Sequence, residues 1–324
     1  FPTRRSSDLD SWKGERIVLF LERPHIETTV WINHREVGMR NSLCVPHVYD
    51  LTSYVTPGKS SLVTIRVDNR IKEINVGPDS HSITDQTQGN WNGIVGKIEL
   101  QSTPEVFFED IQVYPDLAGK KALVRMNVRA SSSAKGEIAL SARSFNTNVN
   151  HEIAPVYQTV TVRKGDNPLE MELPMGQNFL TWDEFSPALY RLTATLKNGK
   201  QIETKQVQFG MREFTINGKW FYVNGRKTML RGTVENCDFP LTGYAPMDVA
   251  SWERVFRICR NYGLNHMRFH SFCPPEAAFI AADLVGFYLQ PEGPSWPNHG
   301  PKLGNGQPID KYLMDETIAL TKAY

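Results

Sequence analysis

The first two hundred residues alternate between apolar and polar positions with the period of β-strands. Runs rich in β-branched and aromatic residues occur at Ile17–Leu21, Thr28–Ile32 and Leu62–Val67, and turn residues such as Pro57-Gly58 separate them. No helical period longer than one turn interrupts this pattern. Residues 10–103 therefore predict a first all-β domain, with few strands for a closed sandwich.

A second stretch, residues 104–210, alternates more regularly. One face of its first long run is apolar, and its members are Ala122, Val124, Met126, Val128 and Ala130. Five similar short runs follow, which makes about seven short strands in all, and Asn198-Gly199 is a hairpin signal between the last two. Seven short strands in some hundred residues are typical of an immunoglobulin-like β-sandwich.

The pattern changes at about residue 211. Two Asn-Gly turns bracket the strand Lys219–Val223 and predict a small β-meander, and Thr228–Thr233 reads as a buried strand. Strands and helices then alternate. The expected elements are a helix capped by Asp248 and ended by Gly263, a strand Leu264–Phe269, a helix from Pro275 to Gly286, a strand Phe287–Pro291, and a helix capped by Asp310.

The first of these helices has apolar residues on helical spacing, at Val249, Trp252, Val255, Phe256, Cys259 and Tyr262. The order β-α-β-α-β-α predicts parallel strands with right-handed crossovers. Residues 211–324 are thus expected to form the first three units of a (β/α)8 TIM barrel. Three units cannot close eight strands, so we expect the chain to be a piece of a longer protein.

Composition excludes several function classes. The chain has 324 residues, a formal net charge of +1 and 22% charged residues, so no basic field favours nucleic acid or a membrane surface. No apolar run approaches the roughly 20 residues that span a bilayer. No phosphate-binding loop or metal motif occurs, so neither cofactor nor metal is predicted. The four cysteines match no redox or zinc spacing and are expected as free buried thiols.

The N-terminal residues 1–9, FPTRRSSDL, fit no domain start. They look like a translated sequencing-adapter scar, and we leave them out of the fold assignment. We expect the true N-terminus, with any export signal, to lie elsewhere.

The strongest candidate for chemistry is the stretch LNHMRFHSFCPP, residues 264–275. It reads as a buried strand that ends in Arg268, His270 and Ser271, and the next predicted strand ends at Glu292. In a barrel of βα units, the C-terminal ends of the strands carry the active site. The sequence therefore indicates a site at these strand ends.

Five segments in this order resemble glycoside hydrolase family 2, the β-galactosidase and β-glucuronidase family. They are TTVWINHREVG, HVYDLTSYVTPGKSSLVTIRVDN, FSPALYRLTATL, FGMREFTINGKWFYVNGRKTMLRG and LNHMRFHSFCPPEAAFIAADLVGFYLQPEG. The resemblance implies a jelly-roll sugar-binding domain, an immunoglobulin-like domain and a TIM barrel, in that order. It implies an enzyme that acts on carbohydrate, with no nucleic-acid or membrane partner.

The same resemblance implies a retaining mechanism with two carboxylates. The family's acid/base Glu follows an Asn at the end of barrel strand four, and its nucleophile Glu ends strand seven. The dipeptide Asn-Glu occurs nowhere in this sequence. We therefore expect both catalytic residues to lie beyond Tyr324, assign none, and expect the 324-residue chain alone to be inactive.

What the resemblance leaves in this chain is a set of substrate-binding candidates. Arg268 would position the catalytic carboxylates by bidentate hydrogen bonds, or would be paired in the barrel mouth for structure. His270 and Ser271 fall where the family has Ser and then His, a ligand of substrate hydroxyls; the alternative is a surface-loop histidine. Glu292 is either an active-site acid or part of a barrel salt bridge.

The remaining candidates lie on loops. Asn236 and Asp238 follow the first barrel strand, where Asp238 would accept a sugar hydroxyl or simply cap the loop. Trp296 would stack on a sugar face or pack beneath its loop. The turn at 90–93 would reach the barrel mouth or bury its Trp91.

Two other functions compete with the enzyme. One is a non-catalytic carbohydrate-binding protein on a degenerate barrel. The other is a two-domain β-sandwich adhesin, which requires the βα pattern after residue 211 to be accidental. Exported members of the family degrade polysaccharides, so a periplasmic or secreted location is expected for the whole protein.

Overall fold

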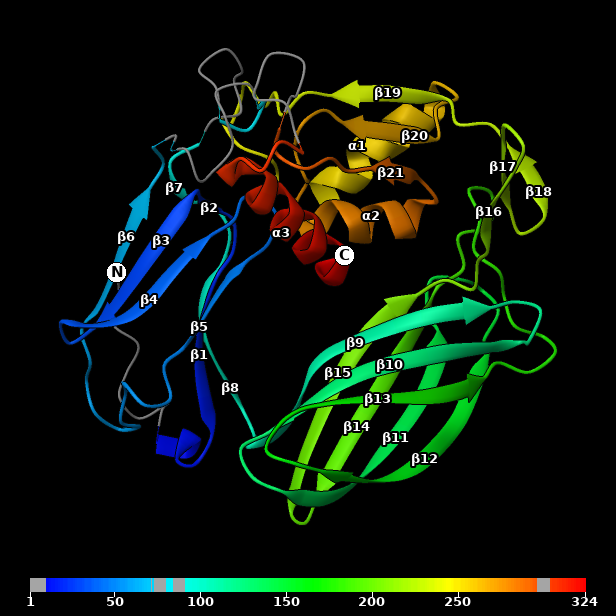
Figure 1. Ribbon diagram of the computed structural model, residues 1–324. Coiled ribbons are helices and arrows are strands. Elements are labelled where there is room, and N and C mark those ends of the chain that lie inside the picture. Colours follow the sequence, from blue (N-terminus) through cyan, green and yellow to red (C-terminus); the bar gives the residue numbers. More distant parts are fainter. Residues whose placement is uncertain (1–9, 71, 73–79, 84–90, 296–303) are drawn as a thin grey trace. The chain divides into compact units, whose positions relative to one another are not determined.

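The computed structural model describes residues 10–70, 72, 80–83, 91–295 and 304–324, which divide into two compact units. The first unit contains the described residues up to Ser102 together with Arg231–Ala282 and Phe287–Tyr324. The second contains Thr103–Leu230 and Asp283–Gly286. Figure 1 shows the elements of both.

The first unit begins with a β domain of small sheets. Its elements are the 3-10 helix Asp10–Trp12 and the strands β1 (Arg16–Leu21), β2 (Pro24–His25), β3 (Glu27–Ile32), β4 (Arg35–Asn41), β5 (His47–Asp50), β6 (Val63–Asp68), β7 (Gly93–Ile94) and β8 (Ile98–Thr103). The strand orders are β5-β1-β8, β4-β3-β6 and β2-β7. The pairings of β3 with β4 and with β6 are antiparallel.

Alternate residues of β1 and β3 build the core of this domain. Ile17, Leu19 and Leu21 from β1 pack with Val30 and Ile32 from β3 and with Tyr49 of β5. Because side chains of a strand alternate between its two faces, this spacing turns every second residue inward. The predicted all-β character of this stretch is confirmed.

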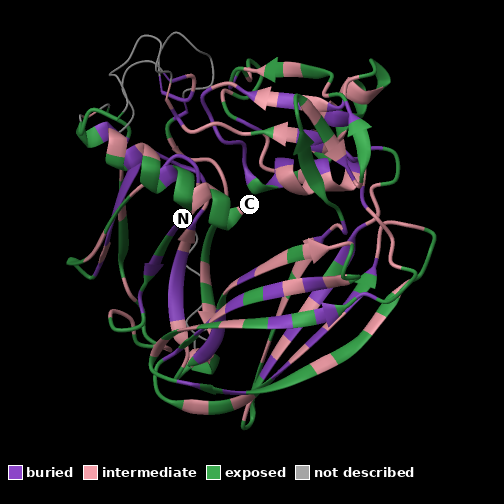
Figure 2. Cartoon of the chain, turned by 45° about the vertical axis from the view of Figure 1, so that its right-hand side comes forward, coloured by how far each residue is buried: buried purple, intermediate pink, exposed green. Residues whose placement is uncertain are grey.

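An immunoglobulin-like β-sandwich makes up most of the second unit. Its strands are β9 (Val106–Asp116), β10 (Lys121–Ala130), β11 (Ala134–Ser144), β12 (Glu152–Val162), β13 (Gly165–Pro174), β14 (Tyr190–Asn198) and β15 (Gln201–Phe209). They form two sheets of order β13-β10-β9 and β12-β11-β14-β15. In Figure 2 buried and exposed residues alternate along these strands.

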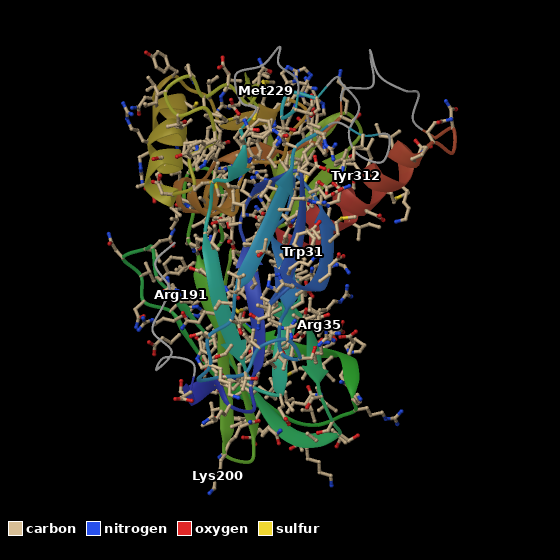
Figure 3. The ribbon with its side chains drawn as sticks, turned by 90° about the vertical axis from the view of Figure 1, so that its left-hand side faces the viewer. Trp31, Arg35, Arg191, Lys200, Met229 and Tyr312 are labelled. Carbon is tan, nitrogen blue, oxygen red and sulfur yellow. The ribbon has the colours of Figure 1, made fainter. Side chains whose placement is uncertain are left out.

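The core of the sandwich confirms the predicted apolar face. All five residues expected to face inward on β10 are buried, alongside Ile138 and Leu140 of β11 and Leu192 of β14. The Asn198-Gly199 turn joins β14 to β15 as expected, with Gly199 in the left-handed region at φ +58°. Lys200 marks the tip of this hairpin (Figure 3).

The meander after the sandwich corrects one predicted strand. Strands β16 (Phe214–Asn217), β17 (Trp220–Val223) and β18 (Arg226–Thr228) form a three-stranded antiparallel sheet. The expected strand Thr228–Thr233 is wrong as a single element. Its first residue ends β18, and its last two belong to the next strand, β19 (Gly232–Glu235), which pairs with a different sheet.

A β/α segment makes up the rest of the first unit, except that the end of its second helix, from Asp283, is assigned to the second unit. It contains β19, α1 (Val249–Asn261), β20 (His266–Phe269), α2 (Glu276–Val285), β21 (Tyr288–Gln290) and α3 (Pro308–Ala323). The three strands are parallel, in the order β19-β20-β21. Parallel strands and helices thus alternate along this part of the chain.

Helix α1 follows the predicted pattern except at its end. Asp248 caps it by accepting a hydrogen bond from the Ser251 amide at 2.8 Å, and Trp252 and Phe256 are buried. Tyr262 was expected on the same buried face, yet it is 82% exposed. It is the C-cap residue, where the backbone leaves the helix.

Helix α3 begins two residues earlier than its expected cap. Gln307 is the N-cap and Pro308 occupies the first turn, while Asp310 accepts hydrogen bonds from the amides of Gly304, Gly306 and Gln307. Asp310 therefore holds the chain that leads into the helix, a role that its carboxylate performs from within the first turn.

Two buried charged side chains connect the β domain to the β/α segment inside the first unit. Arg23 donates from Nη1 to the carbonyls of Leu43 at 2.6 Å and Cys44 at 3.1 Å, and from Nη2 to the carbonyl of Cys273. Glu316 on α3 accepts from the amides of Leu43 at 2.9 Å and Cys44 at 3.0 Å. Figure 3 labels Tyr312, one turn before Glu316 on this helix.

Two further features concern the cysteines and the helices. None of the four cysteines, all of which are described, forms a disulfide, and Cys259 is only half-buried. No helix in the described part of the chain combines the length and the apolar character that crossing a bilayer requires.

We predict that truncating a side chain in the core of the sandwich lowers the free energy of unfolding of the second unit. Leu140→Ala removes a fully buried side chain from β11 and leaves a cavity, so the second unit should lose about 2–5 kcal/mol of unfolding free energy. Ile202→Ala, on β15 and 62% exposed, is the matched control and should change it by less than about 0.5 kcal/mol. Denaturant unfolding measures both, and equal effects would contradict this core assignment.

Candidate functional site

The carboxyl ends of the three parallel strands lie along one edge of their sheet. Glu235 is the last residue of β19, Arg268 is the third residue of β20, and Glu292 follows β21 by two residues. Arg268 stands opposite Val234 and Gln290 in the register. The sequence-predicted residues Arg268, His270 and Glu292 are therefore brought together at this edge.

An ion pair organises the edge. Arg268 Nε donates to Glu292 Oε1 at 2.5 Å, and the Ser271 amide donates to Glu292 Oε2 at 2.8 Å. Burial pushes the pKa of Glu292 upward, but the Arg268 and Ser271 hydrogen bonds and the nearby positive charge outweigh it. The pKa of Glu292 therefore lies below its usual value, and the carboxylate is a fixed negative charge.

His270 links the first strand loop to the β domain. Its Nδ1 lies 3.3 Å from Asn236 Oδ1, and its ring lies against that of His81, with 4.2 Å between the ring centroids. Asn236 and His270 thus form a polar pair across the ends of β19 and β20. Burial, and then the neighbouring His270, lower the pKa of His81, so this ring stays neutral around pH 7.

Ser271 takes a different position from the one the sequence suggested. It is fully buried, with φ at +52°, and its Oγ lies 2.9 Å from His81 Nδ1. Its carbonyl accepts a hydrogen bond from Ser80 Oγ at 3.2 Å. Its amide and hydroxyl therefore support Glu292 and His81 rather than facing outward.

Sequence reasoning missed His81. It lies in the β domain, far from the strand ends along the chain, and no motif surrounds it. Only the folded unit brings it against His270 and Ser271. No local signal in the sequence could have identified it.

Sequence reasoning also missed Glu235. One oxygen accepts a hydrogen bond from the Asp238 amide at 3.0 Å, while the buried Oε2 has no hydrogen-bond partner among the residues that the structure describes. Burial raises the pKa of Glu235 to about 7, against smaller opposing hydrogen bonds from the loop amides. A carboxyl that ends a parallel strand is a signal that could have found it.

The remaining predicted residues divide between surface, core and undescribed parts. Asp238 is exposed, and its amide closes the loop onto Glu235. Trp91 is buried, donates from Nε1 to the Arg23 carbonyl at 3.3 Å and contacts His25 edge-on, as the packing alternative expected. Trp296 lies outside the described residues.

The chemistry available at this edge suits polyhydroxylated ligands. It offers a guanidinium held by a carboxylate, an imidazole beside an amide, and an exposed carboxylate at Asp238. Within the described residues, no group of three or more His, Cys, Asp and Glu side chains could hold a metal ion. Charged donors and acceptors of this kind form the stronger hydrogen bonds to hydroxyl groups.

Comparisons with known proteins match two parts of this chain to domain models of one family. Residues 4–104 match the family model described as "Glycosyl hydrolases family 2, sugar binding domain", and residues 106–212 match "Glycosyl hydrolases family 2". Together the two matches cover well over half of the chain.

Curated relatives are longer than this chain. A β-glucuronidase of Paenibacillus borealis is 23% identical over 301 residues, which cover 88% of this chain and 48% of that protein. A β-galactosidase of Thermoanaerobacter pseudethanolicus is 24% identical over 315 residues, which cover 95% of this chain and 41% of that protein. The chain thus spans less than half the length of these relatives.

Solved structures share the fold. A glycosyl hydrolase family 2 member from Bacteroides cellulosilyticus matches with a TM-score of 0.77 at 19% identity, over 97% of this chain and 40% of that one. The Parabacteroides merdae β-glucuronidase matches with a TM-score of 0.73 at 22% identity, over 97% of this chain and 40% of that one.

We predict that Glu235 makes stability depend on pH. Its folded pKa of about 7 lies above the usual carboxyl value, so the folded state binds more protons between those values and stability falls as pH rises through that window. Glu235→Gln should therefore stabilise the first unit at pH 8, by on the order of 2 kcal/mol, and by less than half as much at pH 5.

Denaturant unfolding at the two pH values measures this difference. The exposed Glu36→Gln in the same unit is the control and should show no such dependence. A Glu235→Gln effect that is the same at both pH values would contradict the buried, uncompensated carboxyl.

Proposed function

The chain belongs to glycoside hydrolase family 2, and we propose that the whole protein hydrolyses terminal β-linked sugars of oligo- or polysaccharides. The reaction is of the β-galactosidase or β-glucuronidase type. Relatives with both names align with most of this chain, which supports the reaction class. The observation that carries the proposal is the Arg268–Glu292 pair at the ends of three parallel strands.

The β/α segment is, in this proposal, the first part of a TIM barrel. Its three strands are parallel and each is followed by a helix. The sheet has two open edges, β19 and β21, and Val234 on β19 is 50% exposed. An apolar, unpaired edge of this kind needs a neighbouring strand, which closure of a barrel supplies.

Hydrolysis in the whole protein would follow the retaining scheme. One carboxylic acid protonates the leaving oxygen, and a second carboxylate about 5–5.5 Å away attacks the anomeric carbon. We propose that both carboxylates belong to the parent protein beyond Tyr324. This chain then supplies residues that orient them and the sugar.

Arg268 has the means to orient a carboxylate. Its Nε–H is committed to Glu292, which fixes the plane of the guanidinium. The four N–H groups on its two Nη atoms are the donors left for a catalytic carboxylate or a sugar oxygen, and 40% of the side chain is exposed. Glu292 is thus a positioning residue that holds Arg268 in one orientation.

The sugar would contact the neighbouring polar groups. His270 and Asn236 offer a donor and an acceptor for ring hydroxyls, Asp238 offers a carboxylate, and Trp296 offers an aromatic face. Ser271 and His81 support this layer from below. A periplasmic or secreted location, as proposed for polysaccharide-degrading members of the family, would give the enzyme access to such substrates.

We predict that Arg268 determines the rate of the whole protein. Arg268→Ala should lower kcat/KM on a 4-nitrophenyl β-glucuronide or β-galactoside by about 100-fold or more, because a misplaced catalytic group costs at least that much. Arg257→Ala is the control: it removes an exposed arginine that pairs with Glu253 on the same helix, and it should leave kcat/KM unchanged.

Two results would overturn the proposal. Hydrolysis by the whole protein that is insensitive to Arg268→Ala would remove this edge from the active site. Sugar binding by calorimetry without hydrolysis of either substrate would favour the alternative of a non-catalytic carbohydrate-binding protein. The 324-residue chain alone should show no turnover, and turnover at native rates would place the catalytic carboxylates within it.

A further inference from the structure

Two buried cysteines meet where the β domain contacts the β/α segment of the first unit. Cys44 lies in the loop between β4 and β5, and Cys273 lies in the loop between β20 and α2. Both side chains are almost completely buried. The family assignment gives neither residue a role.

A single guanidinium holds the two cysteine backbones side by side. Arg23 donates to the carbonyl of Cys44 at 3.1 Å from Nη1 and to the carbonyl of Cys273 from Nη2. The two nitrogens are bonded to the same carbon, so the two carbonyls that they hold must be close. The hydrogen bond between the two thiols is the largest influence on the pKa of each cysteine.

Further hydrogen bonds keep Cys44 in place. Its amide donates to Glu316 at 3.0 Å, and its carbonyl also accepts from Tyr324 Oη at 3.2 Å. Cys273 is followed by two prolines, which restrict the backbone of its loop. A disulfide requires two cysteine backbones to be near each other and correctly facing, and this surrounding structure limits their relative movement.

We propose that Cys44 and Cys273 are a redox-sensitive pair that closes to a disulfide when the whole protein meets a low-molecular-weight disulfide in an oxidising compartment. The cross-link would join the β domain to the loop that carries His270 and Ser271. It does not depend on the proposed hydrolysis, and a periplasmic or secreted location would favour it.

The reaction is two successive thiol–disulfide exchanges. The Cys273 thiolate attacks one sulfur of oxidised glutathione, forms a mixed disulfide and expels one glutathione thiolate. Cys44, after losing its proton, attacks the Cys273 sulfur and expels the second. The two cysteines together lose two electrons and two protons, and one glutathione disulfide becomes two glutathione thiols.

The surroundings favour Cys273 as the attacking group. Its hydrogen bond with Cys44 lowers the pKa of Cys273, and the nearby Arg23 guanidinium lowers it further against the opposing effect of burial. The pKa of Cys44 is raised by the same contact and by burial, which suits a resolving thiol that reacts second. Because both sulfurs are buried, a local opening must precede the first exchange.

The test uses the whole protein with oxidised glutathione, followed by non-reducing peptide mapping by mass spectrometry. The expected result is a peptide containing Cys44 linked to one containing Cys273, together with a rise in Tm of about 5–10 °C from closing a long loop. Cys44→Ser and Cys273→Ser should each abolish the cross-link and the shift. Cys259→Ser, on α1, is the control and should preserve both.

Two outcomes overturn the proposal. The first is that alkylation after treatment with oxidised glutathione recovers Cys44 and Cys273 as free thiols even in mild denaturant, which opens the loop without global unfolding; this result rejects the proposal. Linkage of either residue to Cys237 or Cys259 instead also rejects it. The wild-type peptide map decides the matter even if a serine variant does not fold.

Discussion

Two buried ions hold the segment Leu43–Cys44 from opposite sides of its peptide groups. The Arg23 guanidinium donates hydrogen bonds to the two carbonyl oxygens of this segment, and the Glu316 carboxylate accepts hydrogen bonds from its two amides. Buried charges are stable only when hydrogen bonds replace the water they lose, and this segment provides those bonds for both signs of charge. Because Arg23 also holds Cys273, the same arrangement fixes the loop after β20. The β domain and the β/α segment consequently fold as one unit.

The strand-end site depends on that attachment. The β domain supplies Ser80 and His81, which hold Ser271 by its carbonyl and hydroxyl. Ser271 in turn donates its amide to Glu292, and Glu292 orients Arg268. A chain of hydrogen bonds thus runs from the first domain to the guanidinium proposed to face substrate. Within this unit, loosening of the β domain is expected to disturb Arg268, because the hydrogen bonds that connect them run through Ser271 and Glu292.

Local patterns in the sequence predicted the helices and strands, but they could not predict contacts between segments that are distant in the chain. Alternation identified the inward residues of β10, and Asp248 with Gly263 identified the ends of α1, because both signals are local. The strand predicted at Thr228–Thr233 splits because its two ends pair with different sheets. Arg268, His270 and Glu292 were found through strand ends and family resemblance. His81 was missed because its partners lie about 190 residues away in the chain.

The proposed function puts part of a sugar-binding active site at the ends of β19, β20 and β21, next to the β domain. A crystal structure of the whole protein with a bound, non-hydrolysable terminal-sugar analogue tests it most directly. We expect a sugar ring whose oxygens hydrogen-bond to Arg268 or His270, with the Arg268–Glu292 pair intact beneath it. A sugar bound elsewhere, with these strand ends covered by other parts of the protein, would contradict it.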